Sequence, residues 1–261
     1  MIENYEDFKD AVFRLSKIDL NAYKERQMKR RIDSLIRKNN ADSYQEFVDI
    51  LKKDKKIYEE FINYLTINVS EFYRNPTQWQ VLERDILPYL IDKFSDNLKI
   101  WSAACSTGDE PYSLAMVLSK FIPLNKIKIV ATDIDKQVLE KARMGLYKDK
   151  SLIGLPQEFK TKFFRQVGSS YQVTDDIKKC IEFKQLNLLK DNYPSNCDLI
   201  VCRNVLIYFT DEAKDGIYKK FNNAMKKDAI LFVGSTEQII QSATYKFTSL
   251  KSFFYKKIDE L

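Results

Sequence analysis

The chain has 261 residues, 44% of them hydrophobic, and its 43 Lys and Arg residues against 37 Asp and Glu residues give a net charge of +6. This length suffices for an α/β core with one small additional domain, and no apolar run approaches the roughly 20 residues of a membrane-spanning helix. The chain has no histidine, which excludes imidazole mechanisms and His-ligated metals, and its cysteines form no C-x-x-C pair, so we expect no metal.

The first part of the chain, residues 1–75, contains only helical patterns, which predicts an N-terminal helical domain. Ser43 and Glu46 have the spacing of a capping box that opens the third helix. The apolar stripes of the four expected helices are Phe8, Val12 and Leu15; Met28, Ile32, Leu35 and Ile36; Phe47, Ile50 and Leu51; and Ile57, Phe61 and Leu65.

From residue 76 to residue 261 the pattern changes to alternating strands and helices. A first helix containing Trp79 is expected to stop near Pro88. The alternation that follows is typical of an α/β fold with a parallel sheet covered by helices. Its predicted strands cover 98–102, 127–132, 181–186, 198–202 and 229–234, and its helices cover 110–121, 135–144 and 211–226.

Two segments depart from this alternation. Residues of about 150–180 have turn residues between β-prone flanks, which predicts a small β-hairpin insertion. The segment from Phe247 to Tyr255 follows the last parallel strand after a short excursion, so we expect it to return as an antiparallel strand.

The stretch from Lys99 to Ser119 is the most informative, because an apolar strand leads into a turn of small residues and then a helix. Such a junction places backbone N–H groups and a helix N-terminus beside a ligand crevice. With Gly108 as its one glycine it matches neither a dinucleotide fingerprint nor a P-loop, and Asp109 and Glu110 would repel a triphosphate. The turn suits a ligand with a cationic head, although a plain structural turn is the alternative.

Three further strand ends carry polar side chains. Asp133 is a candidate acceptor for ribose hydroxyls or else a helix cap, a role that Asp135 also fits. The other two strands end on Asn187-Leu188 and on Arg203-Asn204. Because parallel strands present their carboxyl ends at one edge, these ends together favour a nucleoside-type ligand.

Several long segments resemble the CheR-type chemotaxis receptor methyltransferases. The similarity extends over almost the whole chain, including Tyr23–Ile32 and Leu231–Glu237. The segments that carry it best are Thr66–Arg74, Ser102–Ser113, Ala131–Asp135 and Cys202–Phe209.

The resemblance implies a Rossmann-like S-adenosylmethionine-dependent methyltransferase sheet with an N-terminal helical domain and a small β insertion. It implies transfer of a methyl group from S-adenosylmethionine to receptor glutamates, forming methyl esters that tune chemotactic adaptation, with S-adenosylhomocysteine as product. Arg74 and Tyr208 are the implied catalytic residues, although an exposed arginine and a core tyrosine are the structural alternatives. The implied cofactor-binding residues are Asn68, Ser70, Arg74, Glu110, Asp133, Asn187, Leu188, Arg203 and Asn204.

The predicted helix over residues 20–38 is strongly basic. Arg26, Arg30 and Arg37 fall opposite its apolar stripe, so we expect them to be exposed. An acidic receptor helix would be attracted to this face, whereas a solvated surface or an RNA-binding face is the alternative. The resemblance favours receptor binding through this helix. We also expect the protein to be a cytoplasmic monomer that neither binds nucleic acid nor inserts into a membrane.

The β insertion departs from the family pattern, because Gly168 stands alone where two closely spaced glycines are expected. We therefore expect docking mainly through the N-terminal helices. Two other functions stay open at this point: methylation of RNA or a small molecule with the same cofactor, and a non-catalytic cofactor-binding adaptor.

Overall fold

The computed structural model describes residues 2–258, which form two compact units. The first unit contains the chain up to Asn68 together with Tyr208–Asp215. The second contains Val69–Ile207 and the chain from Gly216 onward. Within the described residues, no helix combines the length and apolar character needed to span a membrane.

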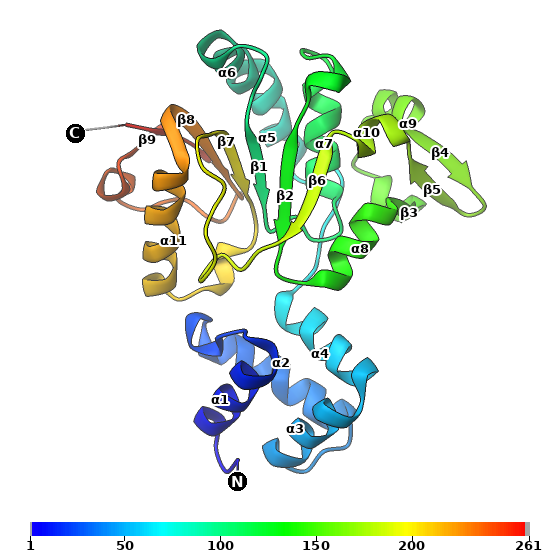
Figure 1. The fold of residues 1–261 in the computed structure, drawn as a ribbon, viewed down its shortest axis with the longest axis vertical. Helices are drawn as coiled ribbons and strands as arrows, with labels where there is room; N and C mark the ends of the chain where they lie inside the picture. The colour runs from blue at the N-terminus through cyan, green and yellow to red at the C-terminus, as the bar shows by residue number, and fades with distance from the viewer. Residues whose placement is uncertain (1, 259–261) are drawn as a thin grey trace. The chain divides into compact units, whose positions relative to one another are not determined.

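The first unit is built from amphipathic helices around an aromatic core, which confirms the helices predicted here (Figure 1). The ring of Phe47 lies 6.4 Å from that of Phe8 and 5.7 Å from that of Phe61, and all three side chains are buried. The helices are α1 (Tyr5–Ser16), α2 (Glu25–Lys38), α3 (Tyr44–Lys53) and α4 (Lys55–Thr66), with the 3₁₀ turn η1 (Leu20–Ala22).

The capping box before α3 differs from its expected form in one bond. Ser43 Oγ accepts the N–H of Glu46 at 3.2 Å, as predicted. The Glu46 carboxylate accepts the N–H of Asp42 at 2.8 Å, one residue before the expected donor. Both bonds satisfy backbone donors that the start of a helix would otherwise leave without partners.

The segment Tyr208–Asp215 joins the first unit although it lies far along the sequence. Tyr23 and Phe209 form an antiparallel bridge, with their ring centres 4.8 Å apart. The N–H of Lys24 donates to the carbonyl of Tyr208 at 2.9 Å. These contacts fix Tyr208 beside the start of α2.

The second unit contains, within the described chain, a seven-stranded sheet in the order β6-β2-β1-β7-β8-β10-β9. Its first five strands are parallel, and β10 pairs antiparallel with both β8 and β9. This confirms the predicted parallel sheet with an antiparallel return, although the return consists of two strands rather than one. The strands are β1 (Ile100–Ala103), β2 (Ile129–Asp133), β6 (Ile181–Gln185), β7 (Cys197–Cys202), β8 (Met225–Val233), β9 (Phe247–Lys251) and β10 (Phe254–Lys257).

The helical segment around Pro88 does not stop there, so that prediction is wrong. Helix continues to Phe94 through a π-helical turn, in which the N–H of Leu87 donates to the carbonyl of Leu82. A proline clashes with the carbonyl four residues earlier, and the wider π turn makes room for it. The remaining helices are α5 (Pro76–Val81), η2 (Leu82–Ile86), α6 (Leu87–Phe94), α7 (Asp109–Leu118), η3 (Leu124–Lys126), α8 (Lys136–Met144), η4 (Asp149–Leu152), α9 (Gln157–Phe163), α10 (Asp175–Lys178), η5 (Leu206–Tyr208), α11 (Asp211–Ala224) and η6 (Ser242–Tyr245).

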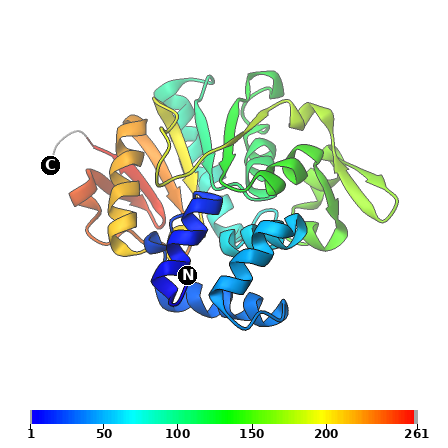
Figure 2. The same cartoon turned by 60° about the horizontal axis from the view of Figure 1, so that its bottom comes forward.

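The predicted hairpin is confirmed as part of a separate three-stranded antiparallel sheet. Strands β4 (Phe164–Val167) and β5 (Ser170–Val173) form it, and Gly168 takes a left-handed φ of 58° in its turn. Strand β3 (Leu146–Lys148) pairs with β5 and was not predicted. Figure 2 shows the β4–β5 hairpin extending away from the large sheet.

Candidate active site

The turn between β1 and α7 uses its own amide groups to anchor itself to β2. The N–H groups of Ala104 and Cys105 both donate to the carbonyl of Thr132 at 2.8 Å. The N–H of Ser106 donates to the Asp133 carboxylate at 2.8 Å. Because these amides already have partners, they are not free to cradle a phosphate, and the turn fits a ligand without one.

Glu110, in the first turn of α7, carries a half-buried carboxyl at the carboxyl end of β1, with 12% of its side chain exposed. Ser102 Oγ donates to its Oε1 at 2.9 Å, and Arg203 Nη1 lies 3.7 Å from its Oε2. Burial raises the pKa of Glu110 to about 7, although the charge of Arg203 and the Ser102 hydrogen bond lower it. The group is therefore poised between its neutral and ionised forms at neutral pH.

Of the two neighbouring carboxylates Asp133 and Asp135, the second is the helix cap. The Asp135 carboxylate accepts the N–H of Gln137 at 2.8 Å and caps α8. Asp133 ends β2, and its carboxylate accepts the N–H groups of both Ser106 and Asp135. Burial raises the pKa of Asp133 to about 6, against the lowering effect of these hydrogen bonds. Asp133 thus organises the turn, while its role toward ribose stays a prediction.

Asn187 and Leu188 follow β6, beside the end of β2. Asn187 Oδ1 accepts the N–H of Leu189 at 2.9 Å, which forms a local turn. The carbonyl of Leu188 accepts the hydroxyl of Tyr193 at 2.6 Å, and the Leu188 side chain is buried. The structure therefore places an apolar side chain and an ordered amide at this strand end.

Arg203 is buried rather than open, with 7% of its surface exposed. Its Nη2 donates to the carbonyl of Arg74 at 2.7 Å and to Gln78 Oε1 at 2.7 Å. The guanidinium also lies over the rings of Phe232 and Trp79, 4.8 and 5.5 Å from their centres. The sequence did not indicate that Arg203 would hold the backbone of Arg74.

Sequence reasoning also missed the role of Glu237, which lay inside a recognised motif. Its buried carboxylate accepts N–H groups from Asn204 at 2.6 Å, Leu206 at 2.7 Å and Gly234 at 2.8 Å. Asn204 has a left-handed φ of 60°, and an added Cβ on Gly234 would lie 2.8 Å from the N atom of Asn204. Glu237 therefore joins the ends of β7 and β8 and shapes the turn that carries Asn204.

Arg74 and Ser70 lie on the segment before α5, in the second unit. Arg74 is half-buried, and its Nη1 donates to the carbonyl of Val69 at 3.4 Å. Burial raises the pKa of Asp109, and a hydrogen bond from Ser70 is among the contacts that oppose this rise. Asn68 belongs to the first unit, where its Nδ2 donates to Thr66 Oγ1 at 2.8 Å.

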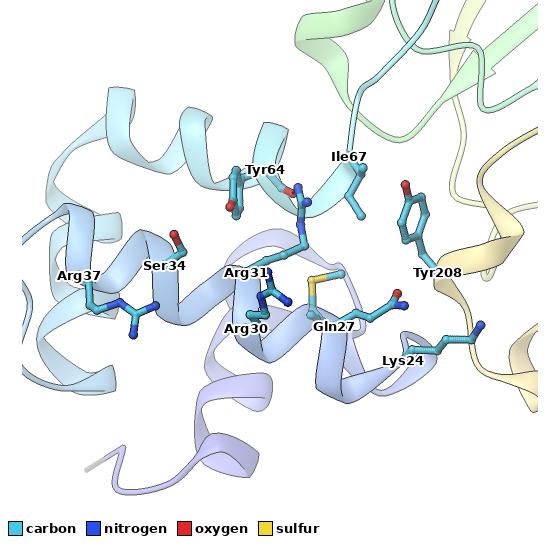
Figure 3. Close-up of a pocket in the computed structure, with 10 residues that line it drawn as sticks. Lys24, Gln27, Arg30, Arg31, Ser34, Arg37, Tyr64, Ile67 and Tyr208 are labelled. Carbon is cyan, nitrogen blue, oxygen red and sulfur yellow. Dashed lines mark hydrogen bonds between the residues drawn. The ribbon is translucent and has the colours of Figure 1, made fainter. Parts of the chain in front are cut away.

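A groove in the first unit is lined by basic side chains and encloses about 600 Å³ (Figure 3). Tyr208 lies at the end near Ile67 and Lys24, and Arg37 lies at the opposite end. Arg26, Arg30 and Arg37 are exposed on α2, as predicted. Arg30 and Arg37 line this basic groove, whereas Arg26 is not among the lining residues. The basic groove is formed by Lys24, Gln27, Met28, Arg30, Arg31, Ser34, Arg37, Tyr64, Ile67 and Tyr208.

The polar groups at the strand ends of the second unit fit a nucleoside that carries a cationic group. Glu110 supplies a carboxyl that a nearby positive charge would ionise, and Asp133 supplies a second one. The hydroxyl of Ser106 is buried and has no hydrogen-bond partner among residues 2–258. Among the described residues, no cluster of His, Cys, Asp or Glu side chains has the arrangement of a metal site.

Comparison with known proteins gives two family matches along the chain. Residues 68–255 match the S-adenosylmethionine-binding domain of CheR methyltransferases, and residues 3–66 match the all-α domain of the same enzymes. The chain is 42% identical to a chemotaxis protein methyltransferase of Listeria innocua, over 98% of this chain and 97% of that protein. It is 32% identical to the chemotaxis protein methyltransferase of Escherichia coli, over 90% of this chain and 84% of that protein. The chain belongs to the CheR family of S-adenosylmethionine-dependent chemotaxis protein methyltransferases.

Proposed function

We propose that this enzyme methylates glutamate side chains on the cytoplasmic helices of chemoreceptors, with Arg74 orienting the reacting carboxylate. The observation that carries the proposal is the pair of carboxyls, half-buried Glu110 and buried Asp133, beside a turn in which the amides of Ala104, Cys105 and Ser106 are already bonded. This arrangement suits a cationic, phosphate-free cofactor. S-adenosylmethionine supplies an electrophilic methyl group when it is bound.

The reaction asks little of the protein in acid–base chemistry. A glutamate carboxylate has a pKa of about 4.3 and is already a nucleophile at neutral pH. A chain without histidine can therefore perform this transfer, because it needs no general base. The task that remains is to hold the carboxylate oxygen in line with the methyl group, which is catalysis by orientation.

Arg74 is the residue that we assign to this orientation. A guanidinium can bind both oxygens of a carboxylate through two parallel hydrogen bonds. Since this contact also withdraws charge from the nucleophile, it aligns the substrate rather than activating it. We assign Tyr208 a supporting catalytic role through its phenol, at the end of the basic groove.

The remaining strand-end residues are assigned to the cofactor. Glu110 would face its cationic amino acid portion and Asp133 its ribose, with Leu188 against the base. Arg203 would act through its ion pair with Glu110. The other proposed cofactor contacts are Asn68, Ser70, Arg74, Asn187 and Asn204.

The receptor is proposed to dock on α2. Arg30 and Arg37 in the basic groove, together with Arg26 on the same helix, would attract the acidic residues around the methylated glutamates.

We propose that the enzyme acts as a cytoplasmic monomer with domains 1–75 and 76–261. We do not propose that the hairpin at Gly168, within the β insertion of about 150–180, binds the C-terminal tail of a receptor.

One assay tests this function. The full chain is incubated with methyl-labelled S-adenosylmethionine and receptor cytoplasmic fragments, and release of labelled methanol by base is measured as the mark of a methyl ester. We expect base-labile label in the receptor and none in total RNA. Label in RNA, or none in any substrate, would support one of the two alternative functions.

The Arg74→Ala variant tests the assigned residue. We expect it to abolish label transfer while cofactor affinity falls only modestly. Arg84→Ala is the matched control, because Arg84 is exposed and pairs only with its neighbour Asp85 among the ion pairs described. Unchanged turnover in Arg74→Ala would remove Arg74 from the mechanism.

A further inference from the structure

The segment that carries Arg74 has an unusual backbone. Tyr73 and Asn75, on either side of Arg74, have left-handed φ values of 56° and 59°. Residues with a Cβ seldom adopt this conformation, and although asparagine does so more often than most, a bulky aromatic residue such as tyrosine is an outlier there. Two such residues in a row of three persist only where surrounding contacts hold them.

Two sets of contacts hold this segment in place. The N–H of Tyr73 donates to Ser113 Oγ at 3.0 Å, and the Tyr73 ring stacks on Trp79 with centres 5.4 Å apart. The carbonyl of Arg74 accepts two hydrogen bonds, from Trp79 Nε1 at 2.9 Å and from Arg203 Nη2 at 2.7 Å. The backbone of Arg74 is therefore fixed by the contacts of Tyr73 and by the two hydrogen bonds to its own carbonyl, while its side chain is half-buried.

Gln78 completes this arrangement from the first turn of α5. Its side chain is buried, and its Oε1 accepts a 2.7 Å hydrogen bond from the same Arg203 Nη2. A guanidinium only donates, so the carboxamide must present its oxygen, and the Gln78 Nε2 is left buried without a partner. An unpartnered buried donor is costly, and the chain retains it beside the residue that we assign to orientation.

We propose that Gln78 is a positioning residue for methyl transfer, which acts by fixing the Arg203 guanidinium that holds the carbonyl of Arg74. This inference rests on the proposed role of Arg74. Without the Gln78 oxygen, Arg203 Nη2 keeps only acceptors on the strained segment itself, the Arg74 carbonyl at 2.7 Å and Asn75 Oδ1 at 3.2 Å. The guanidinium can then shift toward Glu110, whose Oε2 is 3.7 Å away. The strained segment then relaxes, and the Arg74 side chain leaves the geometry needed for the substrate carboxylate.

Gln78→Leu is the test variant, because leucine preserves the volume and removes the acceptor. We expect kcat with receptor fragments to fall about 10- to 100-fold, as small displacements of an orienting group do. The dissociation constant for S-adenosylhomocysteine should change by less than about threefold, since Gln78 acts through Arg74 and Arg74 contributes only modestly to cofactor affinity. Gln80→Leu is the matched control on the exposed side of α5 and should leave both quantities unchanged.

Gln78→Glu restores an oxygen acceptor and should return kcat to within about threefold of the parent value. A purely structural role for Gln78 would instead lower the melting temperature and cofactor affinity of Gln78→Leu together with kcat. An unchanged kcat in Gln78→Leu, or no recovery in Gln78→Glu, would overturn the proposal.

A double-mutant cycle separates this inference from the proposed function. Arg74→Lys keeps the positive charge but loses the two parallel hydrogen bonds that a guanidinium can make to a carboxylate, so this variant should retain residual turnover. If Gln78 acts through Arg74, adding Gln78→Leu should cost less than about twofold in that background, whereas independent action would give the full loss. Full turnover in Arg74→Lys would contradict the proposed role of Arg74. If Arg74→Lys is impaired and the losses of kcat in the two single variants add in the double variant, only the proposed role of Gln78 is contradicted.

Discussion

The two candidate surfaces of this enzyme are built in opposite ways. The basic groove of the first unit is formed largely by side chains of α2, and Arg30 and Arg37 are exposed. The strand ends of the second unit consist of buried groups bonded to one another, such as Arg203 with Gln78 and Glu237 with three backbone amides. An exposed face can attract partners over a distance and tolerate change, whereas an interlocked site fixes geometry and tolerates little.

The interlocked site should be most sensitive at Glu237. Replacing it with alanine leaves three backbone N–H groups without their acceptor, and each buried donor costs about 1–3 kcal/mol. We expect Glu237→Ala to lose about 3 kcal/mol or more of unfolding free energy, measured by urea denaturation. Glu182→Ala, which removes an exposed carboxylate paired with Lys184, should change it by less than about 0.5 kcal/mol. Equal losses in both variants would contradict the contrast between the surfaces.

Gly234 should be the next most sensitive position. A Cβ there would lie 2.5 Å from Glu237 Oε2 and 2.8 Å from the N atom of Asn204. We expect Gly234→Ala to destabilise the protein by about 1–3 kcal/mol and to weaken cofactor binding. Gly216 in α11 is the matched control, because an added Cβ meets no atom within 4 Å. Gly216→Ala should be neutral or stabilising by up to about 1 kcal/mol.

Cofactor binding should depend on pH through Glu110. Its carboxyl has a pKa of about 7 in the free protein, and a cationic cofactor favours the ionised form. The affinity for S-adenosylmethionine should therefore fall as pH decreases below 7. We expect it to be about tenfold weaker at pH 6 than at pH 8, as titration calorimetry can measure. Glu110→Gln should remove most of this dependence, and a parent enzyme with pH-independent affinity would exclude Glu110 from the cofactor contact.

The same group affects folding with the opposite dependence. The ordinary pKa of this glutamate is 4.5, and the folded state raises it to about 7. Between these values the folded protein holds a proton that the unfolded chain has released. Stability of the cofactor-free protein should therefore decrease as pH rises across that window. Thermal melts of the parent and Glu110→Gln at pH 5 and pH 8 can isolate this contribution.

The basic groove should show the smallest effects on the protein itself. Arg30→Glu and Arg37→Glu should slow receptor methylation by about threefold to tenfold at low salt, with a smaller effect at high salt. Their cofactor affinity should stay at the parent value. Arg14→Glu, an exposed residue of α1, makes the same charge change outside the groove and is the control. Arg26→Glu tells whether the groove or the whole α2 face is used.

Much of the fold was predictable because it follows local rules. The Asp135 cap, the helical stripes of the first unit and the parallel strands all depend on residues close together in the sequence. The π turn before Pro88 and the strand β3 were missed. A proline ordinarily signals a helix end, and β3 has only three residues, too few for a period-two pattern.

The candidate site divides in a similar way. Acidic side chains at strand ends could be found from their order along the chain. The hydrogen bonds from Arg203 to Gln78 and from Asn204 to Glu237 join residues 125 and 33 positions apart. Partners so distant depend on tertiary packing, and a single sequence carries no signal for them. Whether an arginine such as Arg26 lies inside a groove depends equally on neighbouring elements.

The return of Tyr208–Asp215 to the first unit matters for anyone who wishes to exchange or delete parts of this enzyme. Phe209 is 4% exposed and packs against Tyr23, with the two rings tilted relative to one another. A truncated chain that starts after residue 75 would keep Phe209 but lose Tyr23, and so would present a bare aromatic ring to solvent. Chimaeras with other receptor specificities must therefore exchange two segments of chain together, the N-terminal helices up to Asn68 and the segment Tyr208–Asp215.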